Sequence, residues 1–256
     1  MVKNKKKKKK KLKKSVKLSI LLILILIMAL AGKLSYDYTK TLNQKLVPLE
    51  EKKDYYVLSD FGLIDERAGH DQNSNNKDDI TDIIDAEKDI IKINPKYVSR
   101  YYQNGYAPKN EGVCTDVIWY AFNKAGYDLK KLISKDIEKT RKKKTYNISV
   151  PDENIDFRRV SNQETFFMRY IESLDTDMYA LGDFMPGDIL TFDNSDHIAL
   201  VGEKYNKNGV PYLVQNRDET QKHKEEDRLE KNEMKVTGHY RFKNSKKLEN
   251  LVKEAK

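Results

Sequence analysis

The chain contains a single cysteine, Cys114, and four histidines, and these side chains could carry nucleophilic chemistry. Cys114 lies just before apolar residues that recur at helical spacing, which predicts its position at the start of a helix. Unpaired N–H groups and the positive end of a helix dipole favour a thiolate, so we expect this position to lower the pKa of the sulfur. The alternative for a lone cysteine is a small buried hydrophobe.

His197 is the histidine best placed to act as a base for that thiol. It begins an apolar run after a polar turn, where a strand end can hold the ring rigidly. His70 lies in a polar linker and His223 in a highly charged segment, which is typical of solvated surface. For His239 we expect a structural role or a place at the edge of a substrate site. Taken alone, His197 also fits an ordinary hydrogen-bonded histidine.

A third side chain should orient the imidazole and fix its tautomer. If the strand that starts at His197 turns and returns antiparallel, a turn centred between Asn206 and Lys207 places Asn216 opposite His197. A slipped register places Gln215 there instead. We predict Asn216 first, with Gln215 as the alternative, and either amide also fits a strand end whose hydrogen bonds are satisfied.

The elements that must position these residues change character along the chain. Apolar spacing predicts one helix from Asp79 to residues 94–95 and a second from Thr115 through Ala125. In the last third, short β-rich runs alternate with turn signals, at 188–192, 197–201, 212–215 and 236–242. We therefore expect an α+β domain in which N-terminal helices pack on an antiparallel β-sheet.

The N-terminal residues predict export. A lysine-rich tail, 1–17, precedes the uncharged apolar segment 18–32, which is short for a membrane span of about 20 residues. Ala29 and Ala31 fit a signal-peptidase site, while the strong hydrophobicity and the flanking lysines fit a retained membrane anchor. In both cases the lysines stay inside, and we expect everything after residue 32 outside the cytoplasm, anchored to the membrane or secreted to the cell envelope.

Beyond the apolar segment we expect a polar stalk at 33–78, one catalytic domain at 79–243 and a charged tail at 244–256. The formal net charge is +9, but eleven of the 49 basic residues lie within the N-terminal tail, which leaves 38 basic against 40 acidic residues. The charge of the chain outside the tail therefore gives no electrostatic support for a nucleic-acid partner. One cysteine and four scattered histidines show no metal-ligand spacing, so we expect no metal and no organic cofactor. We also expect a monomer.

Several separated motifs give the chain a family resemblance. A cysteine at a helix start, a Pro-Gly-Asp turn into a strand, a histidine on the next strand and a polar residue on a third resemble the papain-like NlpC-type cell-wall peptidases and amidases. From about Ile83 to Phe242 the chain more closely resembles the family called domain of unknown function 1287, in segments 112–117, 154–160, 186–189, 197–201 and 238–241. The resemblance implies a papain-like fold of the NlpC type.

The resemblance also marks four charged residues as site or framework residues: Asp116, Asp156, Arg158 and Arg159. An arginine pair can clamp carboxylates, which peptidoglycan stem peptides carry, and the alternative is a buried Asp–Arg network. Two positions depart from the family pattern. Phe157 stands where a histidine is usual, and Gln215 replaces a histidine beside the matching Asn216.

These observations predict a cysteine hydrolase that cleaves an amide bond in the cell envelope, with peptidoglycan stem peptides as the expected substrate. Cys114 attacks the carbonyl, His197 moves the proton, an amide at 216 or 215 holds the ring, and helix-start N–H groups stabilise the oxyanion. Two other classes stay open. One is a thiol acyltransferase on the same scaffold, and the other is a non-catalytic envelope-binding module.

Overall fold

The computed structural model describes residues 27–35, 53–65, 67, 70–180, 182–231 and 235–256. The chain divides into two units, Met1–Lys53 and Asp54–Lys256, and the second holds the folded domain. In the first unit, residues 27–35 are helical and exposed. Among the described residues, none of the helices is both long enough and apolar enough to span a bilayer. The predicted tail at 1–17 and most of the predicted apolar segment 18–32 lie outside the described residues.

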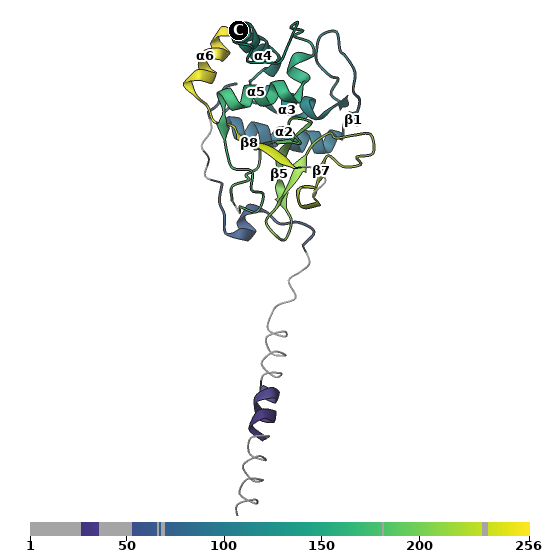
Figure 1. Ribbon diagram of the computed structural model, residues 1–256, viewed down its shortest axis with the longest axis vertical. Helices are drawn as coiled ribbons and strands as arrows, with labels where there is room; N and C mark the ends of the chain where they lie inside the picture. The colour runs from purple at the N-terminus through teal and green to yellow at the C-terminus, as the bar shows by residue number, and fades with distance from the viewer. Residues whose placement is uncertain (1–26, 36–52, 66, 68–69, 181, 232–234) are drawn as a thin grey trace, which may run out of the picture. The chain divides into compact units, whose positions relative to one another are not determined.

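A six-stranded antiparallel sheet is the base of the domain (Figure 1). Its strands, in spatial order, are β3 (Glu172–Ser173), β8 (Val236–Arg241), β4 (Ile189–Phe192), β5 (His197–Tyr205), β6 (Pro211–Val214) and β7 (Glu225–Glu226). A separate parallel ladder pairs β1 (Lys96–Tyr97) with β2 (Glu111–Gly112). The four predicted β-rich runs correspond to β4, β5, β6 and β8.

Helices cover this sheet, and all of them except the C-terminal helix precede it in the chain. They are α2 (Asp79–Ile93), α3 (Cys114–Lys124), α4 (Leu129–Thr140), α5 (Val160–Tyr170) and α6 (Lys246–Glu254), with short 3-10 segments η1 (Leu58–Phe61), η2 (Arg141–Lys143), η3 (Asp156–Arg158) and η4 (Leu229–Lys231). Helices α2 and α3 contact β5, α5 contacts β8, and α4 packs on the other helices. The expected α+β class, with helices packed on an antiparallel sheet, is confirmed.

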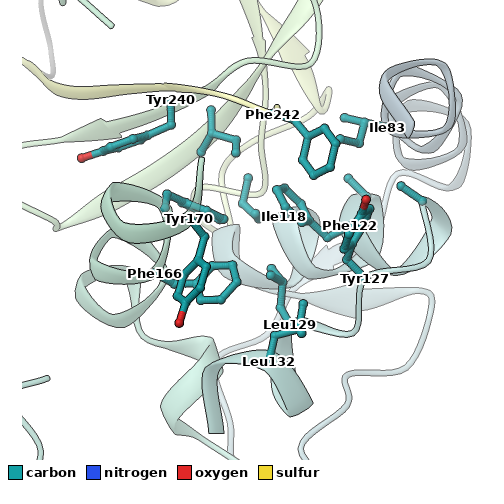
Figure 2. Close-up of a cluster of buried hydrophobic side chains, with 14 of the residues drawn as sticks. Ile83, Ile118, Phe122, Tyr127, Leu129, Leu132, Phe166, Tyr170, Tyr240 and Phe242 are labelled. Atoms are coloured by element: carbon teal, nitrogen blue, oxygen red, sulfur yellow. The ribbon is translucent and has the colours of Figure 1, made fainter. Parts of the chain in front are cut away.

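Strand β5 is buried on both faces, which makes it a rigid support for its first residue. Ile198 and Leu200 belong to the core beneath the helices, whereas Ala199 and Val201 belong to a second apolar cluster on the opposite face. Rings from α3 and the C-terminal strand region fill the helix-side core (Figure 2), where Phe122 lies 5.7 Å from Phe242 between ring centroids. Burying a side chain of this size contributes about 1.5–3 kcal/mol to folding.

The folded unit extends beyond the predicted domain at both ends. Near its start, the backbones of Tyr56 and Tyr205 exchange two 2.8 Å hydrogen bonds, so Tyr56 bridges to β5, and the predicted stalk from residue 54 onward belongs to the folded unit. At its end, Leu248, Leu251 and Val252 are buried, so the predicted charged tail is helix α6 packed on α4. These apolar residues lie at helical spacing among many lysines, and an amphipathic stripe of this kind needs little overall hydrophobicity. Residues 36–52 of the predicted stalk lie outside the described residues.

Glu87 is a buried acid in the middle of α2 that weakens the fold. It is 1% exposed, and neither carboxyl oxygen has a hydrogen-bond partner among the described residues. Burial, reinforced by the charges of Glu203 and Glu225, raises its pKa well above the ordinary value of 4.5. The folded protein therefore keeps a proton that the unfolded chain releases as the pH rises above that value. This difference makes stability fall with increasing pH.

Replacing Glu87 with methionine is expected to raise the free energy of unfolding at pH 7 by about 1–3 kcal/mol, because it removes an unsatisfied buried polar group without leaving a cavity. The measurement is urea denaturation of both proteins from pH 4 to pH 8, and the stabilisation should grow across this range. The matched control is Glu138→Met on the surface of α4, where the free energy of unfolding should change little and show no comparable growth with pH. Equal stability of the Glu87 variant and the wild type at pH 8 would contradict the prediction.

Candidate active site

Cys114 is the first residue of α3, as predicted from the sequence. The helix start is fixed by Asp116, whose carboxylate accepts a 2.8 Å hydrogen bond from the backbone N–H of Val113. Gly112 precedes this turn with a φ of 151°, and a side-chain carbon there would come within 2.8 Å of the Asp116 carboxylate. A glycine at 112 and an aspartate at 116 together therefore place the cysteine at the mouth of the helix.

The Cys114 sulfur lies against the first peptide of β5. The thiol is partly buried, and burial raises its pKa to about 11. Interactions with the backbone N–H groups of Ile198, Thr115 and Cys114 itself act in the opposite direction. The predicted lowering of the pKa is therefore wrong for the resting protein, because the loss of hydration outweighs what the helix-start N–H groups return. The sulfur rests as a neutral thiol.

His197 presents a neutral imidazole with a defined tautomer. The residue is 8% exposed, and its Nε2 lies 2.7 Å from Oε1 of Gln215. An amide oxygen can only accept a hydrogen bond, so Nε2 carries the proton and Nδ1 keeps its lone pair. The Gln215 amide nitrogen points to the Glu226 carboxylate at 3.5 Å, which supports this orientation of the amide. Burial lowers the pKa of His197, so the ring is a free base at neutral pH.

The Cys114 thiol interacts with the residue that follows His197 in the chain and not with the imidazole ring itself. The sulfur interacts with the N–H of Ile198, the residue that follows His197. Among the described residues, no hydrogen bond joins the sulfur to the imidazole ring. Catalytic hydrogen bonds are often long in proteins without substrate and shorten in the complex. Both groups therefore lie at the start of β5 and are uncharged. Cys114 packs against the helix-side core, whereas the His197 ring faces the second apolar cluster, 5.8 Å from the ring of Phe192.

Gln215, not Asn216, contacts the imidazole. In the ladder between β5 and β6, Leu200 pairs with Val214, and continuing that register sets residue 215 opposite 199 and residue 216 opposite 198. Gln215 thus shares the sheet face of His197, whereas Asn216 points to the other face. The first choice from the sequence is wrong, because the turn is centred on Asn208, where Tyr205 pairs with Pro211, and the register that follows sets residue 217 opposite His197. Gln215 reaches the ring from the diagonal position on the same face.

Asn216 instead holds the strand that leads into the nucleophile. Its side-chain N–H₂ group donates to the carbonyl of Gly112 at 2.9 Å and to that of Lys96 at 3.3 Å, which joins β1 to β2. Its oxygen accepts a 2.8 Å hydrogen bond from the ammonium of Lys224. Two adjacent amides at the end of β6 therefore serve the two halves of the site. One orients the base, and the other fixes the backbone two residues before the sulfur.

The carboxylate of Asp116 and the guanidinium of Arg158 form a buried ion pair. The side chains are 8% and 2% exposed, and two hydrogen bonds of 2.7 Å and 2.8 Å join them. A third nitrogen of Arg158 donates to the carbonyl of Arg100 at 2.7 Å. Each of the three guanidinium nitrogens therefore makes a contact within the fold. Arg158 is a buried part of the framework beneath the helix start.

The other predicted pair differs in exposure. Asp156 is buried and accepts a 2.7 Å hydrogen bond from the backbone N–H of Asp152, and burial raises its pKa. Arg159 has a side chain 59% exposed, with its Nε 3.7 Å from Asp156. Of the two predicted arginines, only Arg159 presents its guanidinium to solvent.

His239 belongs to a different network, on β8. Its Nε2 lies 2.9 Å from the Asp188 carboxylate, and its Nδ1 lies 2.7 Å from the carbonyl of Asp175. Asp188 also receives a bidentate contact from Arg241. Strand β4 separates β8 from β5 in the sheet. His239 therefore lies in a buried structural network and not beside Cys114.

Two residues lie near the site although no local sequence pattern predicts it. Tyr97 pairs with Gly112 across the parallel ladder, and burial raises the pKa of its phenol. Lys224 is 3% exposed, although it lies in a segment whose composition predicts solvated surface. Only the fold brings these side chains to the nucleophile.

Hollows flank the β1–β2 ladder on the described surface. An apolar one of about 410 Å³ is lined by residues that include Trp119, Val113 and Asn216. A polar one of about 620 Å³ includes Tyr97 and Lys224. Cys114 and His197 line neither of them. Within the described part of the chain, no group of three or more His, Cys, Asp or Glu side chains is arranged to hold a metal ion.

Comparison with known proteins identifies the family. The model of the family described as "Domain of unknown function (DUF1287)" matches residues 84–242, well over half of the sequence. The chain belongs to this family. The DUF1287 segment contains Cys114, His197, Gln215 and Asn216. A relative, "Uncharacterized protein YijF" from Escherichia coli (strain K12), is 34% identical over 153 residues, which cover 58% of this chain and 72% of that protein. No solved structure matches the chain significantly.

Proposed function

We propose that this DUF1287 protein is an exported cysteine hydrolase with a papain-like fold of the NlpC type, which cleaves an amide bond in peptidoglycan stem peptides. The observation that supports this function is the presence of three groups at the start of β5. A thiol at a helix start lies beside the N–H of Ile198, the neighbouring His197 is a free base, and Gln215 fixes the tautomer of that base. Nucleophile, base and orienting amide on these elements form a Cys-His-amide arrangement.

The proposed reaction starts from neutral groups. The Cys114 thiol attacks the amide carbonyl while Nδ1 of His197 takes its proton, so no isolated buried thiolate has to form. The N–H of Cys114, which has no intrahelical acceptor, donates to the oxyanion. The imidazolium then protonates the leaving amine and leaves a thioester. Water, deprotonated by His197, hydrolyses the thioester to a carboxylate and regenerates the thiol.

The location follows from the N-terminal sequence. The lysine-rich residues before the apolar segment 18–32 favour an orientation in which the DUF1287 domain lies outside the cytoplasm, either anchored or released. The stem peptides of peptidoglycan are the abundant amide substrates in that compartment. Both anchored and released forms reach them.

The experiment that tests the function is digestion of purified peptidoglycan by the full chain, with analysis of the products by mass spectrometry. Hydrolysis adds one water per cleaved bond and exposes one new amine and one new carboxylate. An intact sacculus after prolonged digestion would refute the proposal. Products that carry an added acyl acceptor in place of water would identify acyl transfer instead.

A non-catalytic envelope-binding module is the second candidate, and the raised pKa of Cys114 is the observation that favours it. A module of this kind needs no communication between the thiol and the imidazole. Alkylation by iodoacetamide separates the two candidates. A catalytic pair requires the alkylation rate of Cys114 to change when His197 is replaced by asparagine, whereas a binding module predicts the same rate in both proteins.

Replacing Gln215 with leucine is expected to lower kcat on the order of a hundredfold, at the lower end of what general-base catalysis contributes. Without the amide oxygen, the ring loses its tautomer preference. The hydrogen bond that His197 donates to Gln215 raises the pKa of the ring, so its removal should also move the acid limb of the pH–rate profile to lower pH.

Glutamate at position 215 keeps an acceptor oxygen and supplies the matched variant. Gln215→Glu should retain most of the activity and move the acid limb to higher pH, because a nearby carboxylate stabilises the imidazolium. A merely structural glutamine would change stability without shifting the pH profile. Unchanged kcat in Gln215→Leu would remove this residue from the mechanism.

A further inference from the structure

The polar hollow beside the β1–β2 ladder is a candidate binding site. It has a volume of about 620 Å³ and is lined by Asn94, Pro95, Lys96, Tyr97, Asp218, Glu219, Gln221 and Lys224. Tyr97 connects it to the nucleophile, because this residue pairs with Gly112, two positions before Cys114. The hollow therefore lies next to the proposed reaction centre, on the side of the β1 strand.

Lys224 supplies a cation in the wall of this hollow. The residue is 3% exposed, and its ammonium donates a 2.8 Å hydrogen bond to the side-chain oxygen of Asn216. An ammonium has three donors, and among the described residues this is the one hydrogen bond that it makes. Glu226 and Asp218 act on it through Coulomb attraction, whereas burial lowers its pKa. A buried cation with unused donors favours an anionic ligand group.

The rim of the hollow carries the opposite charge. Asp218 and Glu219 follow β6 and line the same space, and Glu219 is exposed. The Asp218 carboxylate already contacts Arg217 and the hydroxyl of Thr220, so Glu219 is the carboxylate that is more available to a ligand. A ligand with a carboxylate alone would meet repulsion at this rim. A ligand that carries an ammonium beside its carboxylate satisfies both charges.

We propose that this hollow binds the zwitterionic end of an amino-acid side chain, in which one carbon bears both a carboxylate and an ammonium group. Lys224 holds the carboxylate, and Glu219 with Asp218 holds the ammonium. This inference rests on the proposed function, since it assigns the substrate class of the same site. Among stem peptides it selects those whose third residue is a diamino dicarboxylic acid with a free distal end.

The test compares three tripeptide muropeptides as substrates of the full chain. The first contains meso-diaminopimelate, the second contains lysine, which lacks only the distal carboxylate, and the third contains diaminopimelate with that carboxylate amidated. The wild type should prefer the first over the other two by about tenfold or more in kcat/KM, because a site built for a polar group rejects ligands that lack it. Equal kcat/KM values for the three peptides would overturn the proposal.

Lys224→Met removes the cation and keeps the side-chain length. It should raise KM for the diaminopimelate peptide about tenfold and leave the lysine peptide unchanged, which abolishes the preference. A preference that survives in a folded Lys224→Met protein would overturn the role of Lys224. If this variant does not fold, Glu219→Gln at the exposed rim replaces it. The rim variant should raise KM for all three peptides, each of which carries the ammonium, by about threefold, and an unchanged KM would count against the site.

A failure of the proposed hydrolase function can be distinguished from a failure of the proposed binding site. If the wild type cleaves none of the peptides, the hydrolase assignment fails, and calorimetric titration of the same three peptides into the full chain tests the hollow alone. Tighter binding of the diaminopimelate peptide by about tenfold supports the zwitterion site. Equal affinity for the three, or no binding of any, refutes it.

Discussion

Replacing Cys114 with alanine is expected to abolish cleavage of muropeptides while the free energy of unfolding changes by about 1 kcal/mol or less. The sulfur forms the thioester, so its loss should lower kcat on the order of 10⁴-fold or more. Alanine retains helix propensity at the first residue of α3, and the cap made by Asp116 on Val113 does not involve the thiol. Product analysis by mass spectrometry measures activity, and urea denaturation measures stability.

Serine at the same position is the matched control for shape. Cys114→Ser keeps a hydroxyl at the helix mouth, but burial of a group with a still higher pKa gives His197 a harder proton to remove. We therefore expect the serine variant to be as inactive as the alanine variant and equally stable. If Cys114→Ala cleaves muropeptides at the wild-type rate, the cysteine is not the nucleophile, and hydrolysis must use another residue.

Local patterns were enough to predict where the nucleophile lies in the fold. Apolar spacing after Cys114 and before Asn94 is set by contacts a few residues apart, and the structure has helices α3 and α2 at those places. The strand that begins at His197 is predicted for the same reason. An element whose pattern is local can be placed without knowledge of its neighbours.

The orienting amide depends on information that no local pattern contains. Choosing between Gln215 and Asn216 requires the register of β5 against β6, and that register shifts between Val201 and Tyr205. A shift of one residue exchanges the two sheet faces, so a small error in the turn selects the wrong side chain. One amide contacts the imidazole and the next contacts the β1–β2 ladder, and these two roles can be told apart only once the sheet is assembled.

The ionisation of the site is also a property of the assembled fold. The helix start of α3 and the N–H of Ile198 favour a thiolate, but the surrounding core removes water from the Cys114 sulfur. Desolvation is a sum over neighbours that are distant in sequence, so the sequence predicts the sign of the helix contribution and not the net shift. For the same reason, the sequence does not predict that Lys224, in a charge-rich segment, is buried.

Replacing Arg158 with methionine is expected to destabilise the protein by about 3–5 kcal/mol. The substitution leaves the carboxylate of Asp116 buried and without its cation, and an uncompensated buried charge is far more costly than the absence of the pair. The carbonyl of Arg100 would also lose its donor. Chemical denaturation measures the change, and the surface variant Arg159→Met is the matched control, with an expected effect within about 0.5 kcal/mol.

A second substitution separates the charge from the shape of this ion pair. Adding Asp116→Asn to Arg158→Met removes the stranded charge but keeps an acceptor for the N–H of Val113, so the double variant should recover part of the lost stability. If the double variant is no more stable than Arg158→Met, the loss comes from packing rather than from the unpaired carboxylate.

If the ion pair positions the nucleophile, kcat of the double variant should stay low even where its stability returns, because the guanidinium links the helix start at Asp116 to the loop at Arg100. That split between recovered stability and lost kcat is what distinguishes a framework that positions Cys114 from one that only holds the domain together.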